Sequence, residues 1–159
     1  MKLHYSTWYA IWAVVELAAR PGEQVSASEL AAKYGMSQHH LAKVLRTLSL
    51  AGIVESVRGP GGGCTFTGNA KRLTMYDLIL LLEGHEEAHP PGGGALPPLA
   101  REVNRVLDEI DRIASATLKS VTIQTLINNG RRHAAAAPTP PAAGASEAGF
   151  APPPWIVDI

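Results

Sequence analysis

The most constraining feature of the sequence is a pair of short capped helices separated by a glycine-containing turn. Ser26 and Glu29 have the spacing of a capping box, and the helix that they open ends at Gly35. Ser37 is a second N-cap candidate, which opens a helix that ends at Gly52. This order of elements is the helix-turn-helix pattern, whose second helix enters the major groove of DNA.

Two short strands are predicted directly after this pair of helices, over residues 53–57 and 64–67. The segment between them, Arg58-Gly59-Pro60-Gly61-Gly62-Gly63, is a glycine-rich hairpin tip with an arginine at its start. Each piece alone is an ordinary helix or loop. Their order along the chain is that of a winged helix-turn-helix.

The remaining elements are predicted to be helical. Apolar residues at helical spacing make residues 1–20 a buried helix, and Thr74 opens another helix that ends at Glu83-Gly84. A long helix follows from Leu96 to about Ser120. We therefore expect a mainly α fold: a winged helix-turn-helix with a two-stranded β wing and a long C-terminal helix for dimerisation.

The long helix carries apolar positions at alternating steps of four and three residues. This spacing is a heptad seam, narrower than the apolar face that a helix of a monomeric core needs. Pairing with a second copy of the chain is the first interpretation, and packing on the chain's own core is the alternative. The seam comprises Leu99, Val103, Val106, Ile110, Ile113 and Thr117.

Composition divides the chain into three parts: a winged helix-turn-helix over residues 1–73, a loop with dimerisation helices over 74–127, and a tail over 128–159. The tail contains nine alanines, six prolines and three glycines, and we expect it to be disordered. Fourteen basic and fourteen acidic residues leave no net charge. However, residues 1–75 carry eight basic and only four acidic side chains. This excess of positive charge is expected of a protein that binds a polyanion through its N-terminal part.

Several function classes conflict with the sequence. The single cysteine, Cys64, excludes an intramolecular disulfide framework and all-cysteine metal sites. With no apolar run long enough to cross a bilayer and no signal-like start, we expect a cytoplasmic protein without membrane contact. We find no catalytic arrangement of residues on elements expected to converge, and therefore expect no enzyme activity.

At this level of detail the sequence resembles the Rrf2 family of bacterial transcription regulators. The resemblance covers about residues 1–125 and is most specific at the wing. The residues that carry it are Tyr9-Ala10, Leu17-Ala18, Ser37, Leu41-x-Lys43-Val44-Leu45, Leu48, Ala51-Gly52-Ile53-Val54, Ser56-x-Arg58-Gly59-x-x-Gly62-Gly63, Leu73-Thr74 and Glu83-Gly84.

The resemblance implies a homodimeric repressor on a pseudo-palindromic operator in double-stranded DNA. Side chains at the start of the helix from Ser37 can reach base edges, and Gln38 can pair with adenine in bidentate fashion. Lys43 and Arg46 are candidates for phosphate contacts, and Arg58 for the minor groove. The full set of candidate DNA-binding residues is Ser37, Gln38, His39, His40, Lys43, Arg46, Arg58, Gly59, Pro60, Gly61 and Gly62.

Many family members hold an iron–sulfur cluster with three cysteines in the loop after the Glu-Gly pair, but residues 84–94 contain none here. We therefore expect no cofactor. Trp8 and Trp12 lie four residues apart, and with His85 or His89 they could bind a planar organic effector. The alternative is that both tryptophans fill space in the core.

Three further features have two interpretations each. His85 and His89 have metal-ligand spacing with Glu86 nearby, but a solvated acidic loop is the alternative and we expect no metal. Cys64 is either a redox switch in the wing or an inert thiol. The apolar end at 155–159 is either a docking peptide for a protein partner or an unstructured end.

A competing function remains open. The chain could be a metal- or ligand-binding sensor or adaptor whose winged helix contacts proteins rather than DNA. Salt dependence separates the two, because binding to phosphates releases counterions.

Overall fold

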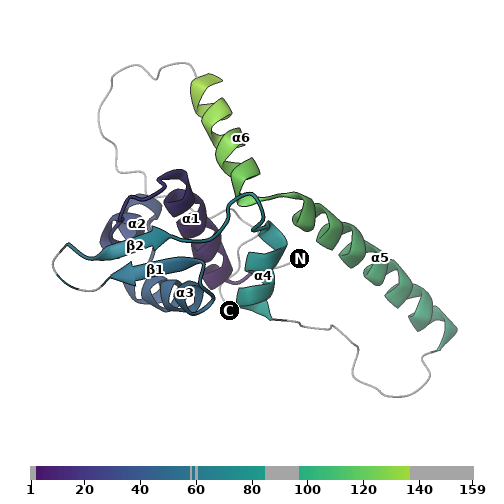
Figure 1. Cartoon of the computed structure of the whole chain (residues 1–159). Helices are drawn as coiled ribbons and strands as arrows, with labels where there is room; N and C mark the ends of the chain where they lie inside the picture. The colour runs from purple at the N-terminus through teal and green to yellow at the C-terminus, as the bar shows by residue number, and fades with distance from the viewer. Residues whose placement is uncertain (1–2, 58, 60, 85–96, 137–159) are drawn as a thin grey trace, which may run out of the picture.

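The computed structural model describes residues 3–57, 59, 61–84 and 97–136. The order of elements confirms a mainly α winged helix, with a two-stranded sheet between the third and fourth helices (Figure 1). The elements are α1 (Tyr5–Ala19), α2 (Ala27–Tyr34), α3 (Gln38–Leu50), β1 (Val54–Val57), β2 (Gly63–Phe66), α4 (Met75–Glu83), α5 (Pro98–Ser120) and α6 (Ile123–Ala136).

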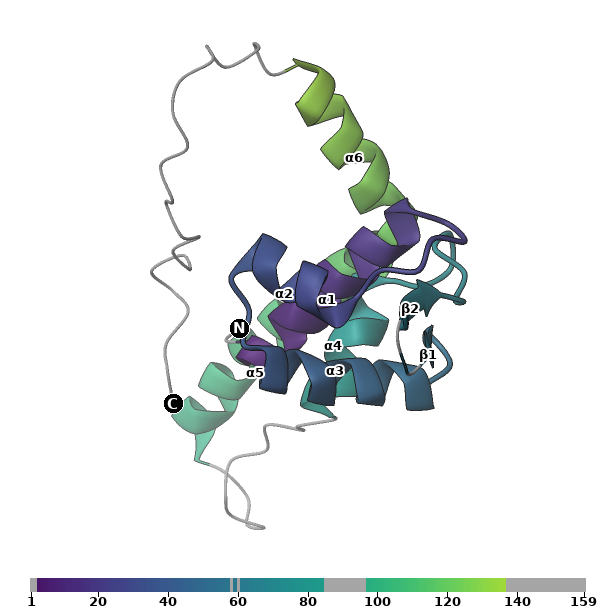
Figure 2. The same cartoon turned by 90° about the vertical axis from the view of Figure 1, so that its left-hand side faces the viewer.

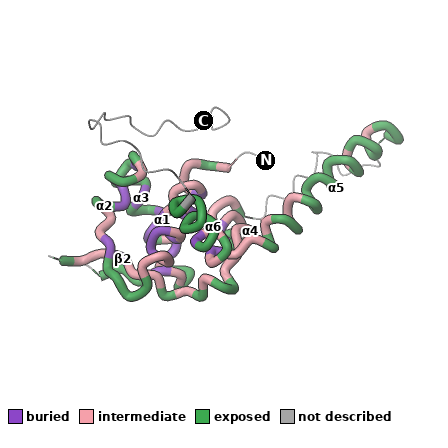
Figure 3. Tube along the Cα trace, turned by 90° about the horizontal axis from the view of Figure 1, so that it is seen from above, coloured by how far each residue is buried: buried purple, intermediate pink, exposed green. Residues whose placement is uncertain are grey.

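Helix α1 lies at the centre of the fold and packs against α3, α4, α6 and β2. Its buried side chains come from more than one face of the helix, as expected of a helix that is apolar almost all round. Ala10, Ala13, Val14 and Leu17 are completely buried. Figure 3 shows α1 coloured as buried over part of its length. The small alanines let neighbouring helices approach the α1 backbone closely.

The helix-turn-helix comprises α2 and α3, and both predicted N-caps are present. The Ser26 hydroxyl accepts the Glu29 N–H at 3.1 Å, and the Ser37 hydroxyl accepts the His40 N–H at 3.5 Å. Gly35 ends α2 in the left-handed conformation that favours glycine, with φ of 62°. Only the serine half of the predicted capping box is present, because the Glu29 carboxylate accepts a hydrogen bond from Arg20 at 2.8 Å instead.

The wing is an antiparallel pair in which Val54 lies opposite Phe66 and Val57 opposite Gly63. Its strands begin within one residue of the predicted positions. Val25 forms a bridge to Cys64 on the other edge of β2, so the loop before α2 acts as a short third strand. This close approach requires glycine at position 63, because a Cβ there would lie 2.7 Å from the Val25 carbonyl oxygen.

Helix α4 begins at Thr74 with a complete capping box, in which Thr74 and Asp77 exchange side-chain to backbone hydrogen bonds. Leu78 is completely buried, whereas Leu81 is 37% exposed. Helix α5 projects away from the body of the protein, and its main contact is with α4 (Figure 1). Within the described ranges, no helix combines the length and apolar character needed to span a bilayer.

Helix α6 corrects the prediction of a tail that is disordered from residue 128. It extends to Ala136, with Ile123 and Ile127 buried in the core that α1 also lines. Arg131 donates to the carbonyl oxygen of Ala19 at 3.2 Å, at the C-terminal end of α1. Alanine is the best helix former, so the alanines that suggested low complexity instead extend the helix. The rest of the predicted tail, 137–159, lies outside the described residues.

Two glycine substitutions test the wing packing. We expect Gly63→Ala to lower the free energy of unfolding by about 1–3 kcal/mol, because the new methyl group collides with the Val25 backbone. Gly130→Ala is the matched control, since Gly130 lies in α6 with open space around it, and we expect a gain of about 0.5–1 kcal/mol. Urea unfolding followed by circular dichroism measures both. Equal effects of the two substitutions would contradict this account of Gly63.

Candidate nucleic-acid interface

Helix α3 has one face in the core and one in solvent. Leu41, Val44, Leu45 and Leu48 are buried and hold the helix against α1. The predicted DNA-binding residues at the start of α3 and along it all lie on the exposed face. These are Ser37, Gln38, His39, His40, Lys43 and Arg46.

The N-terminus of α3 is suited to a negatively charged partner. Its first turn contains no acidic residue, so the positive end of the helix dipole is not compensated there. The rings of His39 and His40 lie side by side, with centroids 6.2 Å apart. Backbone N–H groups, Gln38 and two histidines therefore stand at one exposed helix end.

The wing lies beside α3, and β1 packs against that helix (Figure 1). Gly59 and Gly61 have φ values of 115° and 78°, and the Gly62 N–H donates to the Gly59 carbonyl at 2.8 Å. Glycine is needed at such positive angles, and it leaves the backbone of the tip open to a close partner. The predicted contacts Arg58 and Pro60 lie outside the described residues.

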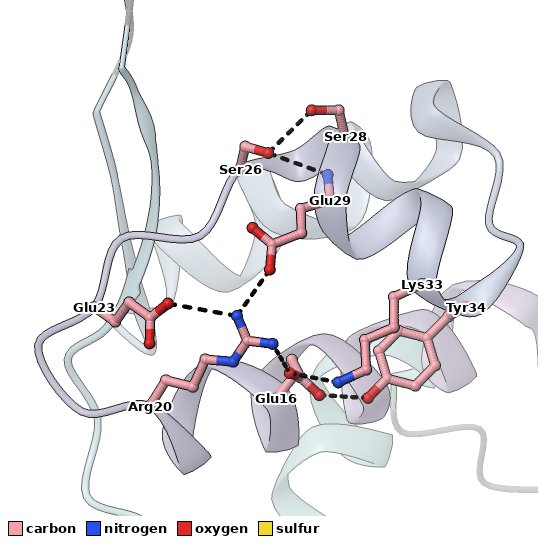
Figure 4. Close-up of polar contacts among 8 residues, drawn as sticks. All are labelled: Glu16, Arg20, Glu23, Ser26, Ser28, Glu29, Lys33 and Tyr34. Carbon is pink, nitrogen blue, oxygen red and sulfur yellow. Dashed lines mark hydrogen bonds and ion pairs between the residues drawn. The ribbon is translucent and has the colours of Figure 1, made fainter. Parts of the chain in front are cut away.

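Helix α2 is tied to α1 by a buried carboxylate that the sequence analysis did not single out. Glu16 is 9% exposed, forms an ion pair with Arg20 at 2.6 Å, and accepts hydrogen bonds from Lys33 at 2.7 Å and the Tyr34 hydroxyl at 2.6 Å (Figure 4). Arg20 also contacts Glu29. A lone glutamate inside an apolar helix, four residues before an arginine, is the signal that could have revealed this cluster.

Protonation of this cluster follows from its contacts. Burial raises the pKa of the Glu16 carboxyl, but the hydrogen bonds from Lys33 and Tyr34 outweigh burial and hold the pKa below its ordinary value. Burial and the bond to Glu16 raise the pKa of the Tyr34 phenol. Near neutral pH Glu16 is therefore ionised and Tyr34 is its hydrogen-bond donor.

A second carboxylate, Glu83, ties the end of α4 to the start of α1. It accepts the His4 backbone N–H at 2.9 Å, the Thr7 hydroxyl and the His4 ring Nδ1. His4 is the N-cap of α1 and makes no capping bond with its own side chain, so Glu83 serves as the cap from a distant element. Burial raises the pKa of Glu83, but the bonds from Thr7 and His4 lower it overall.

The proposed effector residues are described only in part. The rings of Trp8 and Trp12 are neighbours on α1, 5.8 Å apart, but tilted by 42° rather than stacked. Trp12 stacks instead on Tyr34 of α2, with centroids 5.8 Å apart and planes 15° apart. This contact gives Trp12 a packing role. His85, Glu86 and His89 lie outside the described residues, as do residues 155–159, the suggested docking peptide.

The donor groups do not fit a cluster held by three thiolates. Cys64, the single cysteine of the sequence, is 5% exposed in β2, with its sulfur 3.3 Å from the Ser56 hydroxyl oxygen. Such burial is typical of an inert thiol, since redox-sensing cysteines are solvent-accessible. In the described part of the chain, no three His, Cys, Asp or Glu side chains gather at a distance suited to one metal ion.

The heptad seam of α5 faces solvent within a single chain. Its five large apolar side chains are 46–84% exposed, and no residue of α5 is buried. The alternative that the seam packs on the chain's own core is therefore wrong. Leu107, outside the seam, is also 53% exposed, so the apolar face is wider than the heptad pattern predicted.

Comparison with known proteins places the whole described fold in one group. The family model Rrf2, described as an iron-dependent transcriptional regulator, matches residues 3–129. The HTH-type transcriptional regulator BadM of Rhodopseudomonas palustris is 45% identical over 154 residues, which cover 95% of this chain and 99% of the relative.

Solved structures have the same fold. CymR, the global cysteine regulator of B. subtilis, has a TM-score of 0.65 and 25% identity, covering 81% of this chain and 98% of CymR. IscR of T. potens has a TM-score of 0.68 and 21% identity, covering 84% of this chain and 90% of IscR.

We expect Glu83→Gln to lower the free energy of unfolding at pH 7 by about 1.5–3 kcal/mol, the range for hydrogen bonds to a charged group. Because the folded pKa of Glu83 is depressed, its contribution is present above the unfolded value of about 4.3. That contribution is lost as the pH falls through the folded pKa. The difference between wild type and variant should therefore shrink on acidification.

Urea unfolding at pH 7 and at successively lower pH values measures this difference. Glu55→Gln is the control, because Glu55 is exposed on β1 and its removal should leave stability at pH 7 unchanged. A difference between wild type and Glu83→Gln that stays constant across the acid range would contradict the proposed capping by an ionised Glu83.

Proposed function

Because the chain belongs to the Rrf2 family of transcriptional regulators, we propose that it is a homodimeric repressor that binds a pseudo-palindromic operator. The observation that carries this proposal is the exposed polar face of α3, a helix that Ser37 caps and that β1 of the wing packs against. Occupying an operator within a promoter would block transcription without any catalytic step.

Each part of this surface has a role in the proposal. The N-terminal half of α3 enters the major groove, where Gln38 pairs with adenine and His39 and His40 flank it. Lys43 and Arg46, farther along the exposed face, bind phosphates. The glycines of the wing tip allow close approach to DNA. From its position in the sequence, at the start of the wing tip, we propose that Arg58 contacts the minor groove.

The apolar face of α5 supports the dimer. Leu99, Val103, Val106, Leu107 and Ile110 are exposed in one chain, and burying them against a second copy would contribute about 25 cal/mol per Å² of apolar surface. Leu107 makes this face wider than the seam between two paired helices. We therefore propose that α5 packs against α5 of the second copy and against a further part of that copy. A two-fold dimer then presents two copies of α3 to two half-sites.

We expect DNA affinity to fall steeply with salt, and Lys43→Gln or Arg46→Gln to reduce the slope of log K against log salt by about one each. Gln38→Ala should instead weaken binding to the preferred site by about 1–3 kcal/mol with the slope unchanged. The site is first selected by the wild-type protein from random duplexes, and fluorescence anisotropy then measures affinity at several salt concentrations.

Arg132→Gln is the charge-matched control, because Arg132 is exposed on α6, which projects from the opposite side of the body from α3 (Figures 1 and 2). Its slope should equal that of the wild type. Salt-independent binding, or no selected site at all, would favour the competing function of a winged helix that contacts proteins.

The dimer is tested separately. We expect Ile110→Asp to weaken self-association by at least about tenfold, because a carboxylate in an apolar interface loses its hydration. Ala116→Asp places the same charge on the exposed polar side of α5 and should leave association unchanged. Sedimentation equilibrium measures both. An Ile110→Asp protein that associates like the wild type would contradict the proposed dimer surface.

A further inference from the structure

Tyr34 occupies the junction between the two helices of the helix-turn-helix. It is the last residue of α2, Gly35 follows in the left-handed conformation, and Ser37 caps α3 two residues later. The Met36 N–H donates to the Ala31 carbonyl at 2.9 Å, which closes the turn. A displacement of Tyr34 therefore reaches the start of α3 through a short and closely bonded segment.

Two side chains of α1 hold Tyr34 from different directions. The Trp12 ring stacks on the Tyr34 ring, and the Glu16 carboxylate accepts its hydroxyl at 2.6 Å. Trp12 and Glu16 lie one helical turn apart on α1, so together they constrain both the plane and the tip of the ring. Lys33 and Arg20 fix the Glu16 carboxylate in turn (Figure 4).

A third side chain of α1, that of Tyr9, reaches the cap of α3 directly. The Tyr9 hydroxyl accepts the Ser37 N–H at 3.5 Å, and the Tyr9 ring lies 6.4 Å from the Trp12 ring. Helix α1 thus contacts the turn on both sides of Gly35, at Tyr34 and at Ser37. The core packing of α3 alone does not provide these contacts, because its buried residues begin at Leu41.

We infer that Tyr34 is a positioning residue for sequence-specific DNA binding, held by Trp12 and Glu16 so that the N-terminal turn of α3 meets base edges in register. This inference rests on the proposed function. Base contacts need closely defined geometry, whereas phosphate contacts carry no sequence information and tolerate displacement. Loosening Tyr34 should therefore reduce the preference for the operator more than the affinity for DNA in general.

Tyr34→Phe is the first test, because it removes the hydroxyl and keeps the ring that Trp12 stacks on. Glu16 retains Lys33 and Arg20, so its buried charge is not left without partners. We expect the ratio of affinities for the selected site and for random duplex to fall by about fivefold or more at constant salt. Affinity for random duplex should stay the same.

Trp12→Leu is the second test, because it removes the stacking partner from the other side. It should lower the ratio of affinities for the selected site and for random duplex as well. The Tyr34→Phe, Trp12→Leu double variant should lower this ratio by less than the product of the two single effects, since both substitutions loosen the same residue, Tyr34. Tyr76→Phe is the matched control, because Tyr76 lies on α4 with its ring against Lys119 of α5. Its ratio should equal that of the wild type.

A reduced melting temperature with an unchanged affinity ratio in Tyr34→Phe would overturn the inference, because Tyr34 would then be a structural residue only. Proportional loss of affinity for both DNAs would overturn it too. A wild-type protein with no preference among sequences would refute the proposed function, and the inference with it. Tyr34→Phe decides the question even where Trp12→Leu fails to fold.

Discussion

Burial of α1 is the constraint on which the other elements depend. The helix is lined by alanines and aliphatic side chains, and α3, α4, α6 and β2 all pack on it. Residues before and after position 73 therefore share one core, in which Leu78 and Ile127 lie with the helix-turn-helix. Any element that contacts α1 is coupled through a close-packed interior to the others, since such interiors transmit displacements.

Two ionised carboxylates fix the orientation of α1 within this apolar core. Glu16 joins α1 to α2 near the turn before α3, and Glu83 joins the N-cap of α1 to the last residue of α4. The hydrophobic effect is non-directional, whereas a carboxylate with several donors is satisfied in one arrangement only. The polar contacts therefore define how α1 is oriented between the winged helix and the segment that follows Glu83.

Much of this architecture was predictable from local sequence signals. The caps at Ser26, Ser37 and Thr74 and the glycines of the wing act within a few residues, so their spacing alone predicts the elements that they begin or connect. Glu83 could not be assigned in this way, because its partners lie 76 or more residues away. Of the Glu16 partners only Arg20 is local, whereas Lys33 and Tyr34 lie 17 and 18 residues away. Helix α6 was missed because alanine-rich composition is shared by helices and low-complexity segments.

Helices α3 and α5 differ in which of their faces is buried within the chain and which is left for an external partner. In α3 the apolar face is used inside the fold, which leaves polar and basic side chains for an external partner. In α5 the relation is reversed, because its apolar face is exposed and charged pairs such as Glu102 and Arg105 occupy the other side. A surface pair of this kind contributes little to stability. The free energy that would order α5 against a second chain must therefore come from its apolar face, while that available to α3 must come from charge and hydrogen bonding.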